Sequence, residues 1–225
     1  MFSKYKYAFI GLIAVALISV AVLAGNWFLK DDFTKNLDQE LLVLAKVAAN
    51  QPFLDLIKKD ISDLDKTTKD IERAAIYADI GVNLYGLHSY DYAAKYFAKS
   101  LSLNADNYIG YLNLGNAQRQ LRNFAGAKEA YLKSYEVSQY QDSTGCVEVG
   151  DMIQFDKLGF PASDAEKIYL DCLSKSPNDR NMVASLANYY LAHNDKKNAI
   201  KYYDQLSRIE PGNTGIFDIL RELSD

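Results

Sequence analysis

The amino-acid sequence predicts an all-α fold in which about four helix-turn-helix units stack into an α-solenoid. A C-terminal helix caps this array, and a helical stalk and one transmembrane helix precede it. Three observations support this prediction: an apolar run near the amino end, a helical rhythm of apolar residues after it, and a pattern that recurs about every 34 residues. A fixed period of this length indicates stacked units, which build a surface for a partner more often than a catalytic pocket.

Composition excludes several classes of function. The 225-residue chain is 49% hydrophobic and 24% charged, which is typical of a folded protein. Its formal net charge is −4, and its scattered Lys and Arg residues offer no basic patch for nucleic acid. The sequence has no Gly-rich phosphate loop, no His-Glu metal pair and no nucleophile beside a placed histidine. We therefore expect no enzyme, cofactor or metal site, and we interpret His88 and His193 as exposed turn residues.

Residues 1–30 are predicted to form an N-terminal membrane anchor. The segment from Ala8 to Leu29 reads AFIGLIAVALISVAVLAGNWFL, which as a helix is long enough to span a hydrocarbon core of about 30 Å. Trp27 and Phe28 stand at its far edge, where aromatic side chains favour the interface. Lys4 and Lys6 before the run favour a cytoplasmic amino end, so the rest of the chain is predicted to be extracytoplasmic at the cell membrane.

A cleaved signal peptide is the alternative interpretation of the same run. Val22-Leu23-Ala24 followed by Gly25 fits a signal-peptidase site, although the apolar run is longer than a usual signal core. Cleavage would give an exported soluble repeat protein. If the segment stays in the membrane, one stripe of small residues would let a second membrane helix approach; it consists of Gly11, Ala14, Ala21 and Gly25.

Residues 31–73 are predicted to be a helical stalk. One apolar stripe includes Phe33, Leu37 and Leu41, and Pro52 interrupts it because the residue before a proline avoids the helical conformation. A second, coiled-coil-like rhythm then follows, formed by Ile57, Ile61, Leu64, Thr68 and Ile71. This stripe either packs on the first repeat, covering the end of the array, or pairs with another copy of the chain.

The repeated pattern occupies residues 74–213, in units that we place at 74–107, 108–142, 143–179 and 180–213. Small residues recur where two helices of a unit would cross, and large ones are assigned to the space between units. The small residues are Gly81, Gly115 and Gly150, with Ala93, Ala127, Ala165 and Ala199; the large ones are Tyr77, Phe97, Tyr111, Tyr131, Tyr169 and Tyr203. Residues 214–225 are predicted to cap the last unit through Ile216, Phe217, Ile219 and Leu220.

These positions resemble the tetratricopeptide repeat, whose pattern is W-x2-L-G-x2-Y, then A-x3-F, then P. The resemblance implies a right-handed solenoid whose first helices line a concave groove for a protein or peptide. Carried over to this chain, the partner-binding positions are Val82, Tyr85, Ile109, Leu112, Asn113, Asn116, Arg119, Val147, Asp151, Gln154, Asn181, Ala184, Asn188 and Leu191. A subtype that clamps chaperone tails is not matched, because Ala78 and Val82 replace its lysine and asparagine.

The third unit departs from the pattern in two ways. Its internal turn, around Asp156 to Pro161, is three residues longer than in the other units, which is either a partner contact or tolerated drift. It also holds both cysteines of the chain. Antiparallel helices would bring Cys146 and Cys172 to the same end of the pair, so they either form a disulfide or act as two small buried hydrophobic residues. The sequence thus predicts a membrane-tethered adaptor of a secretion, translocation or surface-assembly complex.

Overall fold

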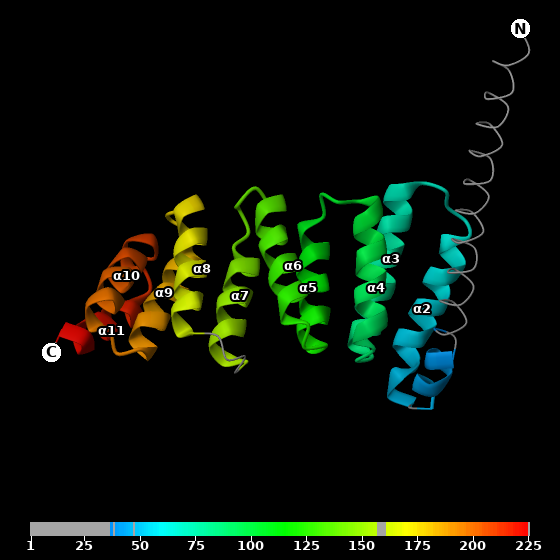
Figure 1. The fold of residues 1–225 in the computed structure, drawn as a ribbon, viewed down its shortest axis with the longest axis horizontal. Coiled ribbons are helices and arrows are strands. Elements are labelled where there is room, and N and C mark those ends of the chain that lie inside the picture. The colour runs from blue at the N-terminus through cyan, green and yellow to red at the C-terminus, as the bar shows by residue number, and fades with distance from the viewer. Residues whose placement is uncertain (1–36, 38, 47, 157–160, 225) are drawn as a thin grey trace, which may run out of the picture. The chain divides into compact units, whose positions relative to one another are not determined.

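The computed structural model describes residues 37, 39–46, 48–156 and 161–224 (Figure 1). The predicted anchor at residues 8–29 lies outside these ranges, as does the small-residue stripe within it. Within the ranges described, no helix is both long enough and apolar enough to cross a membrane. The chain divides into two compact units, residues 1–55 and residues 56–225.

The predicted all-α fold is confirmed, because every regular element in the described part of the chain is helical. A 3-10 turn covers Ala48–Asn50. The α-helices are α2 (Gln51–Leu64), α3 (Asp70–Gly86), α4 (Tyr90–Leu103), α5 (Tyr108–Gln120), α6 (Phe124–Val137), α7 (Thr144–Phe155), α8 (Ala162–Lys175), α9 (Arg180–Ala192), α10 (Lys196–Ile209) and α11 (Thr214–Ser224).

The helix α2 begins one residue before Pro52, in a first turn where the missing proline N–H is not needed. It ends at Leu64, and α3 begins only at Asp70. The rhythm predicted to run on through Thr68 and Ile71 is therefore not one helix. The Arg73 guanidinium closes the turn between the two helices by donating to the carbonyl oxygens of Leu64 and Thr67, at 3.1 and 3.2 Å.

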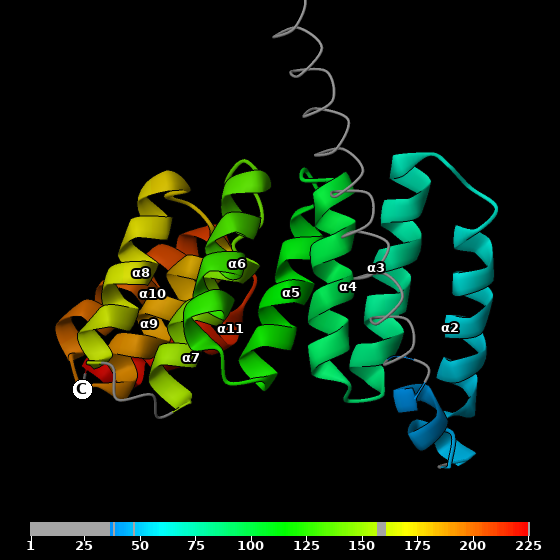
Figure 2. The ribbon, with the colours of Figure 1, turned by 45° about the vertical axis from the view of Figure 1, so that its right-hand side comes forward.

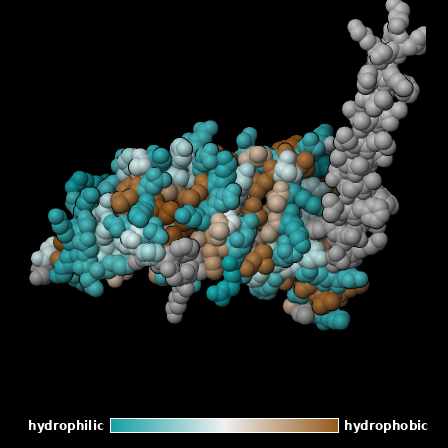
Figure 3. Space-filling view, in the orientation of Figure 1, coloured by the Kyte–Doolittle hydropathy of each residue, from teal (hydrophilic) through white to brown (hydrophobic). Residues whose placement is uncertain are grey.

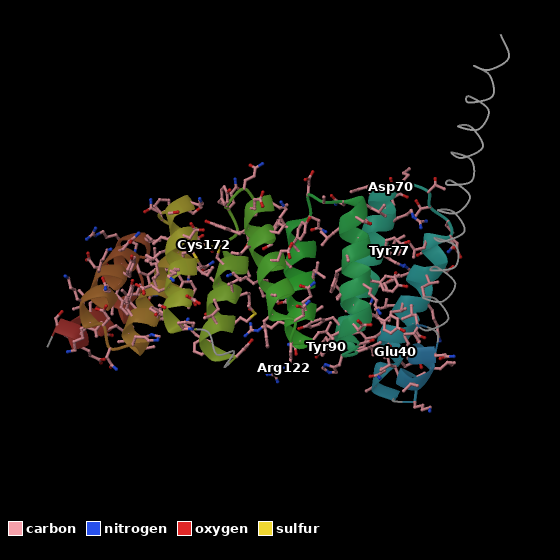
Figure 4. All side chains as sticks on the ribbon, viewed as in Figure 1. Glu40, Asp70, Tyr77, Tyr90, Arg122 and Cys172 are labelled. Carbon is pink, nitrogen blue, oxygen red and sulfur yellow. A yellow bond between two sulfur atoms is a disulfide. The ribbon has the colours of Figure 1, made fainter. Side chains whose placement is uncertain are left out.

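In residues 56–225, the helices from α3 to α10 stand side by side as antiparallel pairs (Figures 1 and 2). Asp70 and Tyr90, the first residues of α3 and α4, lie at opposite ends of their pair (Figure 4). The starts of α5, α6, α9 and α10 are capped by short polar side chains, since Asn107, Asn123, Asp179 and Asp195 each accept a hydrogen bond from a backbone N–H of the following turn.

Each pair in the first three units crosses at a glycine that lies under an aromatic ring. A Cβ added to Gly81 would lie 2.7 Å from the Phe97 ring, and one added to Gly115 would lie 2.6 Å from the Tyr131 ring. These rings were predicted to fill the space between units. Each packs on the first helix of its own unit, and Phe97 also lines a cavity between α3 and α5. Tyr169 contacts both its own unit and the next, because it covers Gly150 and its ring also lies 6.3 Å from that of Tyr189 in the next unit.

The last units share one continuous core, which runs from Ala127 to Ile216. In α11, Ile216 is buried and Ile219 and Leu220 pack against this core. Phe217 is 47% exposed, so the prediction that it covers the last unit is wrong. With 3.6 residues per helical turn, Phe217 points about 100° away from Ile216 and therefore away from the core.

The third unit is joined by a disulfide between Cys146 on α7 and Cys172 on α8, with an S–S distance of 2.01 Å and a Cα–Cα distance of 6.4 Å. Figure 4 places Cys172 on α8. Residues 156–161 connect these two helices, whereas the other pairs are connected by residues 87–89, 121–123 and 193–195. Residues 157–160 of the longer connection lie outside the described ranges.

Candidate partner-binding groove

The first helices of the units, α3, α5, α7 and α9, contribute the residues predicted to bind a partner. We call the surface formed by these residues the groove. Figure 3 shows one face of the molecule, on which apolar side chains gather in patches among hydrophilic ones. The groove is hollowed between α3 and α5, where a cavity of about 80 Å³ is lined by Val82, Tyr85, Phe97, Asn113 and Asn116.

This cavity has an apolar floor and two amide side chains on its α5 side. Val82 is 51% exposed although it is apolar. Ile109, one turn before Asn113 on α5, is 52% exposed. An exposed apolar floor beside amide groups suits a partner that inserts an apolar side chain and offers backbone hydrogen-bonding groups.

The groove asparagines are held in place by tyrosines from the second helices. The Tyr131 hydroxyl donates to Asn116 Oδ1 at 2.7 Å, and the Tyr203 hydroxyl donates to Asn188 Oδ1 at 2.6 Å. The first unit has Phe97 and Val82 at the same positions, so both members of the pair are apolar there. In units two and four the tyrosine hydroxyl therefore donates to the amide oxygen of the asparagine. The amide NH2 of the asparagine is left to donate to a partner.

The third unit has a variant of the same arrangement. The Tyr169 hydroxyl donates to Asp151 Oδ1 at 2.8 Å and accepts from Gln154 Nε2 at 2.7 Å. The predicted groove residues Asp151 and Gln154 thus converge on one phenol. In the fourth unit, Asn181 lies 3.5 Å from Ser143 Oγ, so its amide belongs to the contact between α9 and the start of α7.

Arg119 was predicted to face a partner, but its guanidinium bridges α5 and α7 instead. It makes a bidentate pair with Asp156, at 2.6 and 2.8 Å, and a third bond with Glu148 at 2.9 Å. The hydrogen bond that Arg119 donates to Asp156 raises the pKa of Arg119, and burial raises the pKa of Glu148 above its usual 4.5. With Asp151, this part of the groove has three carboxylates, and Arg122 lines a cavity there together with Arg119 and Asp156, so the carboxylates outnumber these two cations by one.

Sequence reasoning missed Phe97, Glu148 and Asp156 as groove residues. Phe97 was predicted to fill the space between units; it is 1% exposed, and one of its edges lines the 80 Å³ cavity between α3 and α5. Glu148 and Asp151 are three residues apart on α7, which is the spacing of one helix face, whereas Asp156 follows the last residue of α7 and comes near them only in the fold. The described ranges contain no cluster of three or more His, Cys, Asp or Glu side chains that could hold a metal ion.

Because several tyrosines are buried, we expect the stability of the fold to decrease at alkaline pH. Burial raises the pKa of Tyr131, Tyr169 and Tyr190 above the usual 10.0. Above pH 10 the unfolded chain releases these protons while the folded chain retains them, so we expect full stability below pH 10 and a loss as the pH rises further. Helical circular dichroism and phenolate absorbance should change together in an alkaline titration. A helical signal that persists after all the tyrosines have ionised would contradict this expectation.

Comparison with known proteins agrees with the arrangement of these helices. The sequence profile described as "Tetratricopeptide repeat" matches residues 109–140 and 182–213, the second and fourth of the helix pairs. The chain contains tetratricopeptide repeats. The profile covers less than half of the chain, and a search of curated proteins by sequence gives no match.

Solved structures of other proteins have a similar fold. The crystal structure of MamA is similar with a TM-score of 0.54 and 16% identity, over 77% of this chain and 97% of that one. The C-terminal part of a tetratricopeptide repeat-containing protein from Cytophaga hutchinsonii gives a TM-score of 0.53 and 19% identity, over 72% of this chain and 64% of that fragment. At these identities the likeness concerns the fold alone.

Proposed function

We propose that this chain is a non-enzymatic adaptor that binds a segment of a protein partner in the groove of its tetratricopeptide array. The observation that carries the proposal is the cavity lined by Val82, Tyr85, Phe97, Asn113 and Asn116, which is open, apolar at its floor and edged by amides. The tyrosine that fixes Asn116 prepares that amide to donate to a peptide backbone.

The charge of the groove selects the chemistry of the partner segment. Arg119 is already paired with two carboxylates, and the three carboxylates of Glu148, Asp151 and Asp156, on α7 and at its C-terminal end, outnumber the two cations Arg119 and Arg122. Electrostatic complementarity then favours a segment with one apolar side chain for the cavity and a lysine or arginine for the α7 carboxylates. It disfavours an acidic tail.

Selection from a random peptide library tests this function. Peptides selected on the wild-type chain should bind at least about tenfold more weakly to the Val82→Asp variant, because a charge then lies on the apolar floor. The matched control is Leu170→Asp on α8, another exposed apolar residue outside the groove. Selected peptides should be enriched in Lys or Arg. Peptides whose affinity is unchanged by Val82→Asp would contradict the proposal.

We further propose that residues 8–29 anchor the adaptor in the cell membrane, with the array on the extracytoplasmic side beside a secretion, translocation or surface-assembly complex. The apolar length of that run supports the anchor, and the cysteine pair in the third unit is compatible with an oxidising compartment. Carbonate-washed membranes should retain the chain with its full mass. A mature chain that begins at Gly25 would support the exported soluble alternative instead.

A further inference from the structure

A second hollow lies on α5 and α6, on the side of α5 away from the groove. We call it the α5–α6 crevice. It has a volume of about 540 Å³, and its floor is formed by Tyr111, Leu114, Gln118, Gly126 and Ala130. With 3.6 residues per turn, positions 111, 114 and 118 lie about half a turn around the helix from the groove positions 109, 113 and 116. The crevice is therefore separate from the groove.

The crevice lies where the other units of the array have a larger side chain. Ala130 aligns with Tyr96 of the first unit, Ile168 of the third and Tyr202 of the fourth. The Tyr96 ring lies 5.9 Å from the ring of Tyr77, which aligns with Tyr111. In the first and fourth units, the chain's own tyrosine at this position therefore fills a space that the second unit leaves open.

The fourth unit repeats this arrangement with a different neighbour. The Tyr202 ring stacks on Tyr190 at 5.6 Å with an interplanar angle of 7°, and Tyr190 aligns with Gln118 of the crevice. Gly126 aligns with Tyr92 in the first unit, so the second unit has lost side-chain volume at two neighbouring positions. At position 130, the side-chain volume missing relative to units one and four is that of a phenol ring.

Polar groups of the crevice add a requirement for a hydrogen-bond donor. Gln118 Oε1 is buried and has no hydrogen-bond partner among the residues described. It lies over Gly126, where an added Cβ would approach within 2.5 Å of it. The terminal torsion of a glutamine side chain is soft, so this oxygen can turn toward a donor in the crevice. A buried acceptor without a partner is costly, and a hydroxyl would satisfy it.

The rim is acidic. Glu129 and Glu136 are exposed there, and Lys133 is paired with Glu136 at 3.0 Å. We propose that the α5–α6 crevice is a docking site for a tyrosine side chain that projects from a partner protein, with its ring on Leu114 and Ala130 and its hydroxyl donating to Gln118 Oε1. The crevice thus adds a second contact surface to the array, independent of the groove.

The probes are N-acetyltyrosine amide and N-acetylphenylalanine amide, titrated into the full-length chain in detergent and followed by amide chemical shifts. We expect saturable shifts at Gln118, Gly126 and Ala130, with the tyrosine probe binding about fivefold more tightly because of its hydroxyl. In Gln118→Met, which keeps the length of the side chain but removes the acceptor, both probes should bind equally.

Filling variants are the matched test of the site. Ala130→Tyr supplies the ring found in units one and four, and Ala130→Ile supplies the residue of unit three, in case the larger side chain impairs folding. Either variant, folded by circular dichroism, should lose the shifts, while groove peptides still bind. Shifts that persist in the filled variants, or the absence of saturable shifts at the crevice in the wild type, would overturn the proposal without touching the proposed function of the groove.

Discussion

Replacing Cys146 and Cys172 together by alanine is expected to lower the free energy of unfolding by about 3–4 kcal/mol. The physical reason is the unfolded chain: the disulfide closes a loop whose ends are 26 residues apart, and a link over that distance removes roughly this much chain entropy from the unfolded state. Both cysteines are buried, at 0% and 2% exposure, so the substitution also removes packed volume from the core of the third unit.

Urea unfolding followed by circular dichroism measures this effect. Wild-type protein unfolded in the presence of a reductant should show a similarly lowered midpoint, whereas the double alanine variant should not respond to the reductant. Because each repeat contacts only its neighbours, hydrogen exchange should be faster mainly in α7 and α8. Equal unfolding midpoints for oxidised wild type and variant would show that the link contributes nothing to the array.

Gly150→Ala is expected to destabilise the array by about 2 kcal/mol, although alanine is the better helix former. The added Cβ would lie 2.1 Å from Tyr169 Cε1. The ring cannot move aside cheaply, because it is fully buried and its hydroxyl is held by Asp151 and Gln154. Overpacking then outweighs the gain of about 0.5–1 kcal/mol in helix propensity.

Two controls separate the steric effect from a general effect of substituting glycine. Gly215 lies in α11, where an added Cβ would have its nearest neighbour at 3.5 Å, so Gly215→Ala should be neutral or slightly stabilising. In a Tyr169→Ala background the clash is absent, so Gly150→Ala should become stabilising there, which a double-mutant cycle measures. A Gly150→Ala variant as stable as the wild type would show that the helix crossing is looser than described.

Much of the fold follows from the spacing of small residues in the sequence. Glycine is unfavourable inside a helix, so Gly81, Gly115 and Gly150 at recurring intervals indicated a packing requirement, and each lies under an aromatic ring. What spacing could not show was which surface each ring covers. The rings of Phe97 and Tyr131 were predicted to fill the space between units, and the structure shows that each covers a glycine of its own unit. The position of a residue along a helix does not state which neighbouring helix its side chain contacts.

The groove was harder to predict than the fold, because its side chains are committed to one another. Arg119 has the sequence position of a partner-binding residue. Only the structure shows that its guanidinium is paired with the carboxylates of Asp156 and Glu148 from the next repeat. The side-chain oxygen of Asn116 likewise accepts a hydrogen bond from the Tyr131 hydroxyl. Such pairings join residues far apart in the sequence, and no local pattern reports them.

Photo-crosslinking tests the central claim, that the first helices form the partner-binding surface. A benzophenone amino acid is placed at Val82 or Ile109 in the groove, or at Leu170 on α8, in the full-length chain produced in its native cells. All three side chains are exposed, at 51%, 52% and 38%. We predict that both groove positions crosslink the same protein and that position 170 does not. Crosslinking of that protein from position 170 alone, or equally from all three positions, would contradict the claim.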